Sequence, residues 1–251
     1  MRTMTSVAVA GILGLAGMLA AGTSNASPIV FQTPTGAMTS GGSVSAMASF
    51  TLSANTLGIQ LTDTEANPTD VAQLISGLSF TLSNGLSLAN GTLTSSMANF
   101  VTVATGGSLT ASGSGPTGWM LYPSFTLCDI CSSSVSGGTS VPAGLIIGPP
   151  GSGSTYSAAN GSIAGNKPHN PFIDQTASYT LNIQGLSAID SISSVTFRFG
   201  TTYGTDTVNG VCTADCGGTS VAEPGALALF GAGLLGCALF INRRRRASRE
   251  S

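Results

Sequence analysis

The fold class of this chain follows from the stretch Ala46-Met-Ala-Ser-Phe-Thr-Leu-Ser-Ala-Asn-Thr-Leu-Gly-Ile-Gln-Leu61, in which apolar and polar residues alternate. Alternation with a period of two predicts β-strands with one face against a core and the other in water, as in antiparallel sheets. Asn55 lies between two such runs and predicts a hairpin turn. The apolar positions are Ala46, Ala48, Phe50 and Leu52 in the first run and Leu57, Ile59 and Leu61 in the second.

The same alternation recurs later, with shorter apolar runs between the longer ones. The alternating positions are Leu78, Phe80 and Leu82, then Tyr179, Leu181 and Ile183, then Val195, Phe197 and Phe199. The shorter runs cover 100–103, 119–122, 125–127 and 145–147. Many short strands separated by Gly- and Pro-rich turns predict an all-β fold, built as an antiparallel β-sandwich or jelly-roll-like domain.

One short helix is expected after Asn67-Pro68-Thr69-Asp70, with Gly77 as its C-terminal cap. Two segments rich in turn residues, 106–118 and 147–168, are expected to be long loops. The apolar residues at helical spacing are Val71, Leu74, Ile75 and Leu78.

The N-terminus has the pattern of a secretory signal peptide. Arg2 precedes an apolar run from Val7 to Ala21, and the small residues Ser24 and Ala26 follow. Residues 1–26 are therefore expected to form a signal helix that is cleaved after Ala26. An N-terminal membrane anchor is the alternative, for which this run is short.

The segment 27–220 is expected to be one exported domain, an ectodomain with an acidic balance. Its basic residues are Lys167 and Arg198, and its eight acidic residues bring the net charge to −6. A net acidic surface repels phosphate backbones, which argues against nucleic-acid binding. Charged residues make up 7% of the whole chain, against about 25% in ordinary domains. Ser, Thr and Asn must therefore hydrate most of the surface.

The C-terminal region predicts a transmembrane helix followed by a cytoplasmic stop. Residues 225–241 form an uninterrupted run of apolar and small residues, which as a helix would span about 25 Å, near the short limit for a bilayer. Arg243, Arg244, Arg245 and Arg246 follow directly. Arginine clusters stay on the cytoplasmic side, so 247–251 would be a cytoplasmic tail and the ectodomain would face outward. A plain membrane anchor is the alternative.

Three features of this ending together resemble the PEP-CTERM sorting signal of exported proteins from Gram-negative, biofilm-forming bacteria. They are Val221-Ala-Glu-Pro224, the short span and the arginine cluster, so the resemblance covers 221–246. The usual signal has Pro-Glu-Pro, and Ala222 stands here in place of the first proline. The resemblance implies recognition of Glu223 and Pro224 by the membrane enzyme exosortase, with the four arginines as the retention signal. It also implies export through the Sec translocon, transient anchoring in the inner membrane, and then a location at the cell surface or outside the cell.

Parts of the ectodomain are similar to other exported proteins of this kind. The similar stretches are 73–82, Asn160-Gly-Ser-Ile, His169-Asn-Pro-Phe and 195–201. This similarity supports the fold and implies no activity.

Five cysteines are present, of which Cys237 lies in the predicted span and serves there as a small apolar residue. An even set of four in an exported protein predicts structural disulfides, with three connectivities open. A zinc site or a redox pair are the alternatives. The four candidates are Cys128, Cys131, Cys212 and Cys216.

No catalytic residue, metal site or cofactor is predicted. Asp63, Glu65 and Asn67 alternate as calcium ligands do, but Pro68 stands where an EF-hand loop requires glycine. His169 is the single histidine, and no Gly-x-Ser-x-Gly elbow accompanies it.

The ectodomain's function is expected to be non-enzymatic, as an exported and surface-sorted component of the extracellular matrix or biofilm. The alternative is a carbohydrate-binding, lectin-like module that contacts extracellular polysaccharide. In that case Trp119 and Tyr122 would stack on a sugar, although strand spacing equally suits a core role for both.

Overall fold

The computed structural model describes residues 27–122, 130–132, 144–202 and 205–216. The predicted signal peptide at 1–26, the sorting signal at 221–246 and the tail at 247–251 all lie outside these residues, as does the run at 125–127. Within the described ranges, no helix is long and apolar enough to cross a membrane.

The all-β prediction is confirmed, because thirteen strands join in one large sheet and two more form a small hairpin. The large sheet comprises β1 (Ile29–Gln32), β4 (Ala46–Ser53), β5 (Thr56–Asp63), β6 (Ile75–Leu82), β7 (Thr92–Val103), β8 (Leu109–Pro116), β9 (Trp119–Leu121), β10 (Ile130–Ser132), β11 (Ile146–Ile147), β12 (Phe172–Asn182), β13 (Ile192–Phe199), β14 (Asp206–Asn209) and β15 (Val211–Ala214). The small hairpin pairs β2 (Met38–Thr39) with β3 (Gly42–Ser43), and two 3-10 turns cover Val71–Gln73 and Leu88–Asn90.

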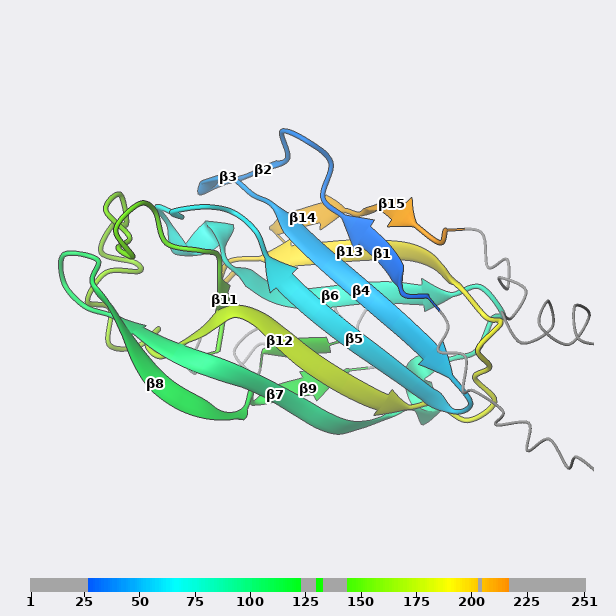
Figure 1. The fold of residues 1–251 in the computed structure, drawn as a ribbon. Helices are drawn as coiled ribbons and strands as arrows, with labels where there is room; N and C mark the ends of the chain where they lie inside the picture. Colours follow the sequence, from blue (N-terminus) through cyan, green and yellow to red (C-terminus); the bar gives the residue numbers. More distant parts are fainter. Residues whose placement is uncertain (1–26, 123–129, 133–143, 203–204, 217–251) are drawn as a thin grey trace, which may run out of the picture. The chain divides into compact units, whose positions relative to one another are not determined.

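The large sheet folds over on itself into two facing layers. One layer has the strand order β8-β7-β12-β5-β4-β1-β15 and the other has β14-β13-β6-β10-β9. Figure 1 shows β4, β5, β12 and β7 in front of β6 and β13. At one end β11 links the layers, pairing antiparallel with β6 and parallel with β12. The β11–β12 pair is an exception to the antiparallel prediction, which the other strand pairs follow.

The two layers are closed along one side by a nearly continuous strand. Only Gly210 separates β14, which pairs with β13, from β15, which pairs with β1. The Gly210 N–H donates to the Val195 carbonyl at 2.8 Å, which continues the pairing across the break. We call this strand, residues 206–214, the seam. On the opposite side β8 and β9 are edge strands, each with one partner among the described residues.

The hairpin predicted around Asn55 is confirmed as β4 and β5, paired with Phe50 opposite Ile59. Asn55 makes the turn with a φ of 57°, a backbone region that Asn tolerates better than most residues. Its N–H donates to the Leu186 carbonyl, and its side-chain oxygen accepts from the Gly185 N–H. The alternating apolar residues are buried, and the Phe50 ring lies 5.4 Å from the ring of Phe80 in the other layer.

The predicted helix is wrong beyond its first turn. The predicted N-terminal cap is present, because the Asp70 side chain accepts a hydrogen bond from the Ala72 N–H and the Gln73 side chain accepts one from the Asp70 N–H. Only Val71–Gln73 is helical, as a 3-10 turn, and Ile75–Leu82 forms β6. Residues 75–78 are buried without interruption because β6 lies inside its layer, with β13 on one side and β10 and β11 on the other. Burial on both faces removes the alternation that marks a strand, and the remaining apolar spacing imitates a helix.

The predicted loop at 106–118 is also wrong, since most of it forms β8. This strand is exposed along nearly its whole length, so it needs no apolar alternation and its Gly, Ser and Thr residues resemble a loop in sequence. The loop predicted at 147–168 has no strand after β11 and stays a loop.

A test of the seam is to add side-chain volume at Gly210. A Cβ there would lie 3.0 Å from the Phe197 ring, 3.3 Å from the Val195 Cβ and 3.4 Å from the Phe31 Cβ. We expect Gly210→Val to lower the free energy of unfolding by about 1–3 kcal/mol, the usual cost of overpacking. The measurement is urea denaturation beside Gly161→Val, where a Cβ would meet no atom within 4 Å. An equal loss in the two variants would contradict the packing argument.

Candidate functional site

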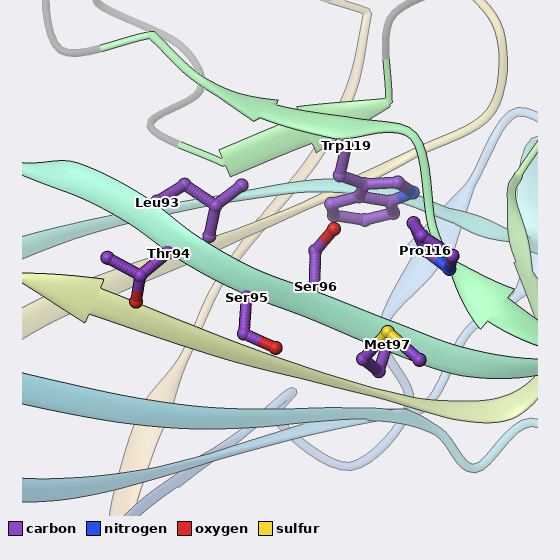
Figure 2. Close-up of a pocket in the computed structure, with 7 residues that line it drawn as sticks. All are labelled: Leu93, Thr94, Ser95, Ser96, Met97, Pro116 and Trp119. Atoms are coloured by element: carbon purple, nitrogen blue, oxygen red, sulfur yellow. The ribbon is translucent and has the colours of Figure 1, made fainter.

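The described residues line an open slot beside β7 (Figure 2). It lies between the first half of β7 and the segment where the chain leaves β8 and enters β9 in the other layer. Its volume is about 380 Å³, within the usual range for small-ligand sites. The lining residues are Leu93, Thr94, Ser95, Ser96, Met97, Pro116 and Trp119.

The slot exists because the β7–β8 hairpin separates at one end. The pairing of β8 with β7 ends where Pro116 lies opposite Met97. One further bond follows, from the Thr117 N–H to the Ser96 carbonyl at 3.0 Å. Beyond it β9 pairs with β10 in the other layer, so β7 has β12 on one side and the slot on the other.

The far end of the slot is narrowed by a close contact at Gly91. A Cβ on Gly91 would lie 3.3 Å from a Leu121 methyl carbon, so β9 approaches the start of β7 there. Contacts at Ser96 and at Gly91 therefore bound the slot at its two ends. This geometry suits a ligand a few residues or sugar units long.

A bulge in β7 sets which side chains face the slot. Ser95 pairs with Thr180 and Leu93 with Leu181, which leaves Thr94 as an additional residue. Figure 2 shows Ser96 directed toward the indole of Trp119, with Thr94 and Ser95 on the other side of the strand. The slot therefore presents the Ser96 hydroxyl together with Leu93 and the largely buried Trp119.

Trp119 is held firmly in the core beside the slot. Its side chain is 3% exposed, and its ring packs 5.3 Å from that of Tyr179. The indole N–H donates to the Gly144 carbonyl at 2.6 Å. Burial raises the pKa of the neighbouring Tyr179 hydroxyl well above its usual value. Trp119 thus contributes little ring surface for a sugar to stack on.

Tyr122 does not join Trp119 in one platform. Alternation along β9 places Trp119 inside and Met120 outside. The Tyr122 hydroxyl contacts the Met120 Sδ at 3.4 Å, so it accompanies the outward-facing side chain. The structure therefore separates the two aromatic residues that the sequence proposed for sugar stacking.

The disulfide prediction is confirmed for Cys212 and Cys216, which are bonded to each other at the end of the seam. This pair is local, so of the three possible connectivities of the four candidates only the one with two local pairs remains. Their bond leaves neither sulfur as a free thiolate, so these two cannot serve a four-cysteine zinc site. Cys131 is also disulfide-bonded, and Cys128 lies outside the described residues.

The calcium-like series at Asp63, Glu65 and Asn67 is used for internal contacts. Glu65 accepts from the Ser43 hydroxyl at 2.7 Å, and Asn67 donates to the Ser157 hydroxyl at 3.4 Å. Across the described ranges, no group of three or more His, Cys, Asp or Glu residues could hold a metal ion.

Asp63 is an unusual group in this interior, because its carboxyl is buried at 1% exposure. One oxygen accepts from the Glu65 N–H at 3.0 Å, and the other has no hydrogen-bond partner. Burial raises the pKa of this carboxyl well above its usual value, and the Glu65 and Ile75 N–H groups oppose the shift more weakly.

The Asn160-Gly-Ser-Ile and His169-Asn-Pro-Phe stretches both anchor the long loop after β11. Asn160 donates to Asp70 at 2.5 Å, and its oxygen accepts from the Ser162 N–H. The Asn170 side chain accepts from the Val103 N–H at 2.7 Å. His169 contacts the Ser162 carbonyl through Nδ1 at 2.6 Å. These motifs hold the loop against the ends of the strands.

Sequence reasoning missed the slot residues on β7 and at Pro116. Their one signal was the Gly115-Pro-Thr-Gly118 stretch, which interrupts the hairpin. The predicted sorting residues Glu223, Pro224, Arg243, Arg244, Arg245 and Arg246 lie outside the described residues.

No family model matches the chain, and no curated protein or solved structure matches it either.

The buried carboxyl of Asp63 makes stability depend on pH. An unfolded Asp titrates near pH 3.9 and the folded pKa is higher, so between these values the folded state keeps a proton that the unfolded state has lost. Stability should therefore fall as the pH rises through this window. We expect Asp63→Asn, which cannot ionise, to gain stability relative to the parent chain with rising pH.

The measurement is denaturant unfolding across the pH range, with Asp215→Asn as the control that removes an exposed carboxylate. Parallel stability curves for the parent chain and Asp63→Asn would show that Asp63 carries no such pH dependence.

Proposed function

We propose that this chain is an exported protein, sorted to the cell surface, that acts without catalysis as a component of the extracellular matrix or biofilm. The observation that carries the proposal is the Cys212–Cys216 disulfide. Disulfides persist in oxidising compartments outside the cytoplasm. Export through the Sec translocon would supply that environment.

The surface chemistry fits a neutral and hydrated matrix. No charged residue occurs between Val71 and Cys128, a range that includes all of β6, β7, β8 and β9. Outward hydroxyls pair across the strands, as between Thr62 and Thr176, whose oxygens are 3.0 Å apart. Such a surface stays hydrated without charge, and it suits a two-layered β-sandwich that faces extracellular polymers.

The sorting step follows from the C-terminal resemblance. In this proposal exosortase recognises Glu223 and Pro224 outside the bilayer, while residues 225–241 anchor the chain in the inner membrane. The four arginines hold the end on the cytoplasmic side. Pro224 disfavours a helical conformation at Glu223, which keeps these two proposed recognition residues extended.

Sorting is tested by deleting Arg243–Arg246 from the full chain in a host that contains exosortase. We expect loss of retention at the inner membrane and an altered mature C-terminus, because nothing then stops the span on the cytoplasmic side. Cell fractionation and mass spectrometry of the C-terminus are the measurements. Deleting Ala247–Glu250 removes the same length and is the control. Identical location and processing with and without exosortase would refute the sorting proposal.

The slot favours a second candidate function, the binding of a neutral glycan. It has no charged lining residue, and the Ser96 hydroxyl lies in it together with the apolar side chain of Leu93. Neutral sugars have the matching combination of hydroxyls and apolar C–H surfaces. Its small volume and bounded ends suit a short glycan segment.

This candidate is tested with Met97→Arg. Met97 lines the slot and is 47% exposed, so the change places a charge in a neutral site without disturbing the core. We expect weaker retardation of the chain in affinity electrophoresis through neutral polysaccharide gels. Thr51→Arg, an exposed site on β4, is the control. An unretarded parent chain, or equal losses in both variants, would exclude glycan binding at the slot.

A further inference from the structure

The edge strand β8 is open along most of its outer side. It pairs with β7 from Leu109 to Pro116, and within the described ranges its other side meets only an isolated bridge between Ser108 and Thr155 at one end. Figure 1 shows β8 at the outer margin of its layer, beyond β7. An edge of this kind offers a row of backbone donors and acceptors to another strand.

Two hydrogen bonds fix which backbone groups face outward. Ser108 accepts from the Ala104 N–H at 2.9 Å, and Thr117 donates to Ser96 at 3.0 Å, so both ends of the strand direct these groups toward β7. Backbone direction alternates along a strand. Counting inward from the two ends, the residues whose backbone groups face outward from the sheet edge are Leu109, Ala111, Ser114 and Pro116.

This edge has few of the features that prevent pairing between proteins. Natural edges are protected by charged side chains, proline, bulges or covering segments. β8 contains no charge, and its proline is its last residue. One bulge is present at Ser112, between Ala111 opposite Val101 and Gly113 opposite Phe100. The Ser112 hydroxyl lies 2.8 Å from that of Thr102, so the bulged residue bonds back toward β7.

Symmetry and the absence of charge along this edge together favour a second copy of the same chain as the partner. Two copies with a net charge of −6 over residues 27–220 repel wherever their carboxylates face each other. No charged residue occurs between Val71 and Cys128, so two β8 edges can meet without facing charges. An antiparallel pair of identical strands also satisfies two-fold symmetry, in which each edge is its own complement.

We infer that two copies of this chain associate edge to edge through β8, continuing the β8-β7-β12-β5-β4-β1-β15 layer from one molecule into the next. The extended layer deepens the proposed role in the matrix, on which its extracellular setting rests. Because each molecule uses its one β8 edge in a two-fold symmetric pair, the pairing ends at a dimer.

The test places like charges on the edge with Ala111→Lys combined with Ser114→Lys in the full-length chain. Both residues are exposed, so the core is unaffected. We expect the parent chain in detergent solution to form a dimer as concentration rises, measured by sedimentation velocity. The dissociation constant of the double variant's dimer should be at least about tenfold higher than that of the parent chain, because each edge then presents lysines to the edge of the other copy. Added salt should restore part of the association by screening.

The matched control is Thr51→Lys combined with Ser53→Lys, two exposed positions on β4, which has a partner strand on both sides. This control should dimerise like the parent chain. A parent chain that stays monomeric, a dimer unaffected by the β8 lysines, or an equal loss in the β4 control would each overturn the inference. Association in solution and sorting in cells are measured separately. If no dimer forms, the sorting proposal is unaffected, and if sorting does not depend on exosortase, the dimer inference is unaffected.

Discussion

The continuous passage of the chain from β14 to β15 is the constraint on which the rest of this architecture depends. One strand serves both layers, and Gly210 allows it to change layers without losing contact with Val195. The Cys212–Cys216 disulfide lies at the end of this strand and limits the freedom of its last residues. With one side closed in this way, the apolar faces of the two layers enclose the main core, and the free edges of β8 and β9 fall on the opposite side.

The slot and the free β8 edge are two consequences of that open side. The slot forms where β8 leaves β7 and the chain crosses to the other layer, because one backbone cannot pair with both β7 and β10. The β8 edge stays exposed because no described strand follows it in its layer. Both features lie in a part of the chain without charge, so any association proposed there would depend on hydrogen bonding and apolar contact rather than on electrostatic attraction.

The interior contains few ionisable groups, and their positions reflect its construction. Asp63 ends β5 near the 3-10 turn, where burial favours its neutral form. Arg198 lies on β13 and is fully buried, with its guanidinium donating to the Thr202 carbonyl at 2.8 Å. The polar side chains of Asp70, Asn160 and Asn170 hold the long loop against the strand ends. The fold thus uses polar contacts mainly to attach loops and apolar contacts to join layers.

The sequence by itself determined the all-β class, the β4–β5 hairpin and the strands β12 and β13, because apolar and polar residues alternate along each of these strands. It also contains the terminal patterns from which export and sorting are proposed. It misassigned β6 and β8 for opposite reasons, since a strand buried on both faces and a strand exposed on both faces each lose the alternation by which strands are recognised. Only the tertiary structure decided that Trp119 and Tyr122 point apart, that Ser96 faces Trp119 across a slot, and that β8 forms an edge. These relations depend on which strands become neighbours, and pairing between residues far apart in sequence leaves no local pattern to read.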